Sequence, residues 1–150
     1  MVKSMPEDVL RFIRSERAGV LAVEMLNGSP HAATVHFAHT ENPLVFYFET
    51  DRDYRKSEPL FGREVTRASF VIGLNEMDMK TFQLDGEVRL VKDTEKALFN
   101  EAYFGKFPEK LKKSQNPNCV FFTFVPTWWR FTDWKTAQGK VILTSELKHR

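Results

Sequence analysis

A short polar run at residues 50–56 places two cations beside the predicted junction of a strand and a helix. With Asp53 as the N-cap of a helix expected over Asp53–Phe61, Arg55 and Lys56 lie in the first turn of that helix. Cations in a first turn oppose the helix dipole, and an anion bound to the free backbone N–H groups would remove that penalty. The run therefore indicates a phosphate site. A solvated charge run, neutralised by its two aspartates, is the equal alternative.

Gln83 is a second candidate, because it stands on the polar face of a strand expected over Lys80–Val91, whose other face is apolar. A carboxamide donates and accepts hydrogen bonds at once, which suits the edge of a heterocycle. An ordinary surface role is the favoured alternative for this residue taken alone.

Aromatic side chains crowd the segment from Pro126 to Trp134. Successive residues of a strand point to opposite faces, so Trp128 and Trp129 cannot both face a core. One of them must reach an interface, a ligand or solvent, close to Arg130. The segment predicts either a subunit interface or the stacking of a planar ligand.

Other kinds of site are not indicated. The chain has neither G-x-G-x-x-G nor G-x-x-x-x-G-K-S/T, and no G-x-S-x-G elbow. Cys119 lies in an apolar strand and is interpreted as a small core residue. On one strand over His31–Thr40, His36 and His39 would point to opposite faces, and His31 and His39 would lie about 26 Å apart. No metal site is therefore expected.

Hydrophobic periodicity and turn signals predict a mainly β fold with a few helices. Strands are expected over Gly19–Met25, His31–Thr40, Leu44–Thr50, Ala68–Leu74, Lys80–Val91, Asn118–Val125 continuing as Trp128–Trp134 beyond a bend at Pro126, and Lys140–Thr144. Helical patterns cover Met5–Glu16, Asp53–Phe61 and Asp93–Phe104, with a further turn over Pro108–Lys113. Asn27-Gly28 is a hairpin signal, and Gly86 marks a bulge or a close backbone approach. Six or seven largely antiparallel strands favour an α+β barrel, since closure removes sheet edges.

The composition fits a single domain over residues 1–150. Hydrophobic residues make up 42%, and 22 basic against 20 acidic residues give a net charge of +2, which does not favour nucleic acid. We expect no membrane span and no signal peptide, and a single cysteine fits a cytoplasmic location. Fourteen Phe and three Trp indicate a planar ligand, a large interface or a Phe-rich core.

The order of several segments resembles the pyridoxamine 5′-phosphate oxidase-like, FMN-binding split β-barrel family, from about Glu7 to Ser145. An N-terminal helix precedes AGVLA at 18–22, followed by PHAATVHF at 30–37 and a strand that ends in Thr50 before Arg55-Lys56. FQLDGE at 82–87 and PTWWRFTD at 126–133 complete the pattern. The chain looks most like the small general-stress or flavin-reductase-like branch.

The resemblance implies a homodimer with FMN at the subunit interface, acting as an oxidoreductase on a small redox substrate with a possible nicotinamide donor. The flavin would carry the hydride or electron transfer, so no catalytic side chain is identified. By the family pattern, residues 34–37 run alongside the flavin, Arg55 and Lys56 hold the phosphate, and Thr50 closes the phosphate end. Gln83 meets the polar edge of the ring, and a residue of the 128–130 segment approaches from the second subunit. These residues are Thr34, Val35, His36, Phe37, Thr50, Arg55, Lys56, Gln83, Trp128, Trp129 and Arg130.

The C-terminal strand departs from that of true pyridoxamine phosphate oxidases, which carry an Arg-Leu-His-Asp-Arg type segment. Here Arg130-Phe131-Thr132-Asp133-Trp134 stands in its place, so vitamin B6 oxidation is not expected. One alternative is a non-catalytic binder of flavin, of a deazaflavin, or of haem with His36, His39 or His149 as the axial ligand. A second alternative is a barrel that stacks single-stranded nucleic acid or sugar on the 128–134 aromatics.

Overall fold

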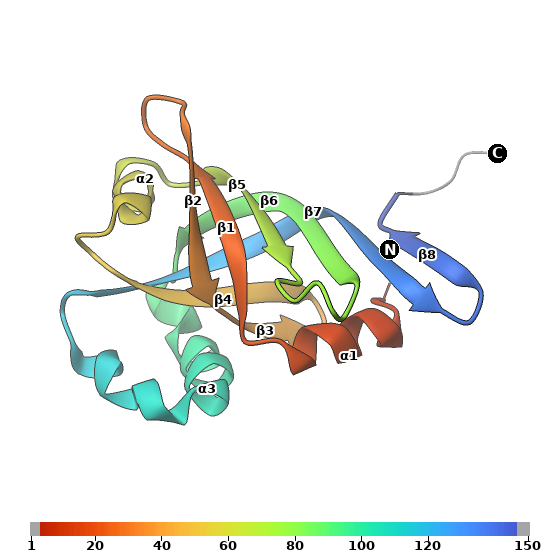
Figure 1. The fold of residues 1–150 in the computed structure, drawn as a ribbon. Helices are drawn as coiled ribbons and strands as arrows, with labels where there is room; N and C mark the ends of the chain where they lie inside the picture. Colours follow the sequence, from red (N-terminus) through yellow and green to blue (C-terminus); the bar gives the residue numbers. More distant parts are fainter. Residues whose placement is uncertain (1–3, 147–150) are drawn as a thin grey trace.

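The computed structural model describes residues 4–146, which form one curled antiparallel sheet with short helices around it (Figure 1). The strands are β1 (Ala18–Glu24), β2 (Pro30–His36), β3 (Ala38–Glu41), β4 (Leu44–Asp51), β5 (Thr66–Ile72), β6 (Lys80–Leu90), β7 (Cys119–Thr136) and β8 (Gly139–Thr144). The α-helices are α1 (Glu7–Ser15), α2 (Glu58–Gly62) and α3 (Lys96–Lys106). Three 3-10 helices are η1 (Arg55–Ser57), η2 (Asp93–Glu95) and η3 (Pro108–Gln115). None of the helices within residues 4–146 has the length and hydropathy needed to cross a bilayer.

The strand order β2-β1-β5-β6-β7-β4-β3 forces the sheet to curl. β2 and β3 lie at opposite ends of that order, yet only Phe37 separates them along the chain. The two edges must therefore approach each other, which confirms the predicted split barrel. The single strand expected over His31–Thr40 was wrong, because the backbone leaves β2 at Phe37, whose N–H donates to the Arg17 carbonyl at 3.1 Å. This break gives eight strands instead of six or seven.

The expected long C-terminal strand is confirmed, and it joins the two halves of the barrel. The first part of β7 pairs with β4 and the last part with β8, while β6 pairs along most of its length. The register between β6 and β7 shifts at Asp85/Gly86, which confirms the predicted irregularity. A Cβ at Gly86 would collide with the Val125 carbonyl oxygen, so the close approach requires glycine.

Most phenylalanines pack in two cores, which confirms the Phe-rich core as the explanation for most of the aromatic excess. The main core fills the curled sheet, and the apolar face of α1 covers one end of it through Phe12, which packs 5.6 Å from the Phe131 ring. A second core lies between β3, β4 and α3, where Tyr47 meets Phe99 at 5.8 Å. The face of the sheet that carries Thr34 and Gln83 belongs to neither core.

Candidate functional site

A cross-strand row of residues runs over the outer face of the sheet. The registers align Thr34 with Val20, Val20 with Val71, Val71 with Gln83 and Gln83 with Arg130. Neighbouring strands lie about 4.8 Å apart, so Thr34 and Gln83 are separated by about 14 Å. Arg130 Nη2 donates to Gln83 Oε1 at 2.9 Å. Three of the residues predicted from sequence, on β2, β6 and β7, thus share one face.

The four predicted residues at the end of β2 divide between the two faces. Val35 and Phe37 are buried in the main core, while Thr34 and His36 are exposed. Val35 and Phe37 therefore offer only backbone groups to a ligand on the outer face. His36 Nδ1 lies 2.7 Å from Lys110 Nζ. Burial, together with the charge of Lys110, holds the pKa of His36 below its ordinary value.

The helix expected over Asp53–Phe61 was wrong in its start. A 3-10 turn, η1, comes first with Tyr54 as its N-cap, and the α-helix α2 begins only at Glu58 and has five residues. Arg55 and Lys56 therefore precede the α-helix, and the argument from its dipole does not apply. Pro59 lies in the first turn of α2, where a missing backbone N–H leaves no helical hydrogen bond unmade.

Lys56 is nevertheless placed for an anion. It is 8% exposed, η1 lies beside β2, and its ammonium sits 4.5 Å from the centre of the Tyr54 ring. Burial lowers the pKa of Lys56, although Asp51 and Glu49 act in the opposite direction. Among residues 4–146, neither Arg55 nor Lys56 forms an ion pair with a carboxylate. A buried cation without a carboxylate partner fits a phosphate.

Thr50 carries a further spare polar group. Its side chain is 3% exposed, and its hydroxyl finds no hydrogen-bond partner within the described part of the chain. Buried hydroxyls are usually paired, so an unpaired one at the end of β4 is available to a ligand, a water or a partner subunit.

The two adjacent tryptophans point to opposite faces of the sheet, as the alternation of side chains along a strand predicts. Trp129 points inward and meets the Phe82 ring at 5.8 Å, partly buried against the main core. Trp128 pairs with Asp85 on the outer face and donates from Nε1 to Glu146 at 2.8 Å. Within one protomer, Trp128 and Arg130 share the face of Gln83, whereas Trp129 does not.

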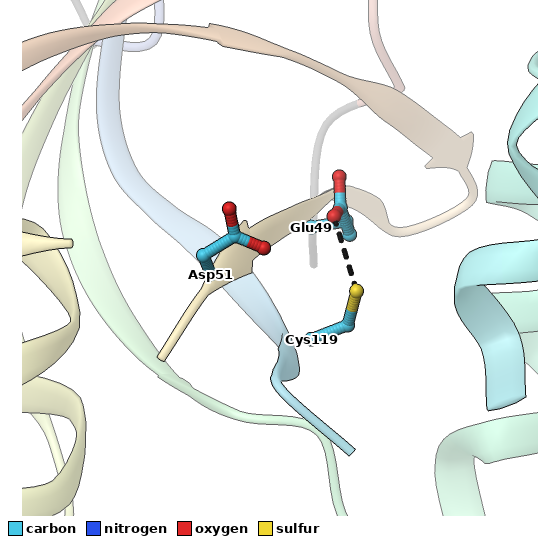
Figure 2. Close-up of side chains that lie close together, drawn as sticks. All are labelled: Glu49, Asp51 and Cys119. Carbon is cyan, nitrogen blue, oxygen red and sulfur yellow. Dashed lines mark hydrogen bonds between the residues drawn. The ribbon is translucent and has the colours of Figure 1, made fainter. Parts of the chain in front are cut away.

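Glu49, Asp51 and Cys119 form a cluster beside β4 that was not predicted from the sequence (Figure 2). Glu49 and Asp51 point from the same side of the strand, and Cys119 pairs across from Asp51. The Cys119 thiol donates to Glu49 Oε1 at 3.5 Å, and Lys113 Nζ lies 3.3 Å from the same oxygen. The alternation of the two acids was visible in the sequence, but the position of Cys119 depends on the β4–β7 register.

Burial, together with Glu49, raises the pKa of Cys119 to about 11. The Lys113 ammonium balances the Glu49 charge, so these side chains form an ion-paired and hydrogen-bonded network. The expectation that Cys119 is a simple core residue is wrong, because the thiol lies among polar groups.

The curled barrel and its polar outer face define a split-barrel protein, and comparison with known families places it more closely. The family model described as pyridoxamine 5′-phosphate oxidase matches residues 5–133. The chain therefore belongs to the pyridoxamine 5′-phosphate oxidase family. No curated protein gives a significant match.

Solved structures show the same fold at low identity. A haem-binding protein from Mycobacterium smegmatis superposes with a TM-score of 0.73 at 15% identity, over 95% of this chain and 60% of that one. The chain thus spans about three fifths of that protein's length. A Clostridium acetobutylicum protein related to general stress protein 26 has a TM-score of 0.63 at 13% identity, covering 92% of both chains. General stress protein 26 of Bacillus anthracis has a TM-score of 0.62 at 22% identity, over 83% of this chain and 91% of that one.

Proposed function

We propose that this protein is an FMN-binding oxidoreductase that holds its cofactor on the outer face of the sheet, between two copies of the chain. The observation that carries the proposal is Lys56, a buried cation without a carboxylate partner in the described chain, beside the strand of Thr34 and His36. Membership of the family supports the same ligand.

The residues present fit the two ends of FMN. Arg55 and Lys56 would hold the phosphate through charge-assisted hydrogen bonds. Gln83 accepts from Arg130 through its carbonyl oxygen, and its NH2 group would donate to a ring carbonyl. Thr34 would line the cofactor on the outer face. When bound, the flavin supplies hydride or electron transfer, and the protein's part is binding and orientation.

A second copy would cover the outer face. The centre of that face carries small or half-buried side chains, including Val20, Ala22, Ser69 and Val71, over which another sheet could approach closely. Trp128 and Arg130 lie on the same face and would be available to the partner's cofactor. A homodimer would therefore complete the site and exclude water from the flavin.

The phosphate assignment is tested by comparing FMN with riboflavin, which lacks the phosphate. Charge-assisted hydrogen bonds contribute about 1.5–3 kcal/mol each, so Arg55→Ala with Lys56→Ala should weaken FMN binding by about 100-fold or more. Riboflavin affinity should change little. Fluorescence titration of both ligands measures this, with exposed Lys140→Ala on β8 as the control. Loss of both ligands equally, or of neither, would remove these residues from a phosphate site.

Haem is the second candidate, favoured by the likeness to the M. smegmatis haem-binding protein. Of the histidines named as axial ligands, His39 is 8% exposed at its side chain and its Nε2 lies 2.9 Å from Glu41, which leaves it unavailable. His149 lies outside the described residues. His36 is exposed on the outer face and is the remaining ligand to consider.

The stacking of nucleic acid or sugar finds less support. Trp129 and Phe131 turn into the main core, so the 128–134 aromatics do not form one row on the surface.

A visible absorption spectrum distinguishes bound flavin from bound haem, and multiple turnovers with a nicotinamide donor distinguish an enzyme from a flavin store. A deazaflavin would use the same face and is separated from FMN by its own spectrum.

A further inference from the structure

The proton position on His36 follows from its contact with Lys110. His36 Nδ1 and Lys110 Nζ lie 2.7 Å apart, a hydrogen-bond distance. A lysine ammonium has three donors and no acceptor. Nδ1 must therefore accept, which leaves the imidazole proton on Nε2.

Lys110 is held in this position by its surroundings on η3 and α3. Its ammonium lies 3.3 Å from the Tyr103 hydroxyl and 4.9 Å from the centre of the Phe107 ring. The His36 ring packs against the same Phe107 ring, with centroids 5.4 Å apart. The pair is thus fixed by packing on an aromatic residue that is fully buried.

The charges facing His36 oppose a second proton on the ring. Burial is the largest cause that lowers the pKa of His36, and Lys110 from η3 and Arg17 from the α1–β1 connection add to it, while Glu109 and Glu49 act in the other direction. The surroundings therefore favour the neutral ring over the imidazolium.

We propose that Lys110 is a specificity-determining residue: it holds His36 as the Nε2–H tautomer, a hydrogen-bond donor toward the outer face, and so selects ligands with acceptor atoms over haem iron. Iron coordination through Nε2 needs a lone pair on that atom and the proton on Nδ1. That proton would face the Lys110 ammonium. A flavin, whose ring edge and side chain carry oxygen acceptors, suits the donor tautomer.

The inference rests on the proposed ligand face, but its first test needs no ligand. Nitrogen-detected NMR of the histidine rings in the cofactor-free protein reports the tautomer, with His36→Gln identifying the signal. The expected result at pH 7 is a protonated Nε2 and an unprotonated Nδ1. A protonated Nδ1, or an imidazolium, would overturn the proposal whether or not flavin binds.

Variants of Lys110 separate tautomer control from folding. Lys110→Arg keeps a donor-only cation and should keep the Nε2–H tautomer. Lys110→Met keeps the apolar stem and should release Nδ1, giving a mixture of tautomers and a higher His36 pKa. Lys112→Met, on the same 3-10 helix, is the matched control and should change nothing. A Lys110→Met spectrum equal to that of the unaltered protein would refute tautomer control by Lys110.

Hemin titration tests the selection itself. Lys110→Met should bind hemin about 10-fold or more tightly than the unaltered protein, which corresponds to about 1.4 kcal/mol. The gain should vanish when His36→Gln is added. Equal hemin affinity in the two proteins, or a gain that persists without His36, contradicts the selection. Failure of FMN to bind, with the tautomer as expected, would count against the proposed function alone.

Discussion

Near the end of β4, one buried charged side chain has an ion-pair partner and another does not. Glu49 accepts from the Cys119 thiol and pairs with Lys113, so its charge is balanced inside the protein. Lys56, on the turn that follows, contacts the Tyr54 ring but forms no ion pair with a carboxylate within residues 4–146. The first arrangement is a structural network, and the second is where we propose that the phosphate binds.

The Cys119 thiol should be unreactive. Its pKa rises from 9.0 to about 11, which lowers the thiolate fraction at pH 7 about 100-fold. Glu49→Gln removes a cause of the rise and should speed alkylation by iodoacetamide severalfold. Lys113→Gln removes a charge that favours the thiolate and should slow it. Alkylation rates that change in the same direction in both variants would contradict this picture.

Single residues were predictable from the sequence where their type alone limits their role. Gln83 was placed correctly on the outer face because strand alternation fixes it. Cys119 was misjudged as a core residue, because its polar neighbours come from β4, seventy positions away. Lys110 was not identified as a partner of His36, since a contact across 74 positions leaves no local signal.

At the scale of elements, a turn signalled by local residue types was predicted correctly, whereas a strand break imposed by the tertiary structure was missed. Asn27-Gly28 makes the predicted turn, with Gly28 at a φ of +86° that favours glycine. The break at Phe37 was missed, although the alternation ends there, since the adjacent residues Phe37 and Ala38 are both buried. That break is set by the edge closure of the barrel, which no local pattern contains.

The β6 bulge should be sensitive to a single methyl group. A Cβ at Gly86 would collide with the Val125 carbonyl and lie 2.9 Å from the Phe124 ring. Gly86→Ala should lower the free energy of unfolding by about 1–3 kcal/mol. Gly105→Ala is the matched control in α3, where a Cβ meets nothing within 4 Å, and should raise it by about 0.5–1 kcal/mol. Urea denaturation measures both, and a Gly86→Ala as stable as the parent would contradict the close approach.

The junction of α1 with β3 should respond to acid. Arg14 donates to both Glu41 oxygens and holds the pKa of Glu41 at about 2. A carboxyl with a lowered pKa stabilises the fold above its ordinary value of 4.5, and this stabilisation is lost as the pH falls toward 2. Glu41→Gln should therefore flatten the fall of unfolding free energy between about pH 4.5 and 2, measured by urea titrations. A slope in Glu41→Gln as steep as in the unaltered protein would contradict the assignment.

At the scale of the whole molecule, the outer face distinguishes this barrel from one closed on itself. The sequence predicted the split barrel through the order of its segments, and the fold agrees. The meeting of β2, which carries Thr34, with η1, which carries Lys56, arises only when the sheet curls. The candidate site therefore depends on the curl of the sheet, so its residues could be named from the sequence but their arrangement could not be predicted.

Dimer formation through this face should depend on its central residues. Val71 is half-buried in the middle of the Thr34–Gln83 row, and an aspartate there would place an unpaired charge in the proposed interface. Val71→Asp should convert the proposed dimer to monomer in sedimentation and weaken FMN binding about 10-fold or more. Leu98→Asp on α3, exposed to 47%, is the control and should stay dimeric. A Val71→Asp protein that remains dimeric would place the interface elsewhere.

The measurement that bears most directly on the central claim is the visible absorption spectrum of the protein after FMN is added and the mixture is passed through gel filtration. The outer-face site predicts a flavin band that elutes with the protein at one FMN per chain, and a band that is lost in the Arg55→Ala, Lys56→Ala variant. Elution of all the FMN as free cofactor from a folded protein would contradict a flavin site on this face.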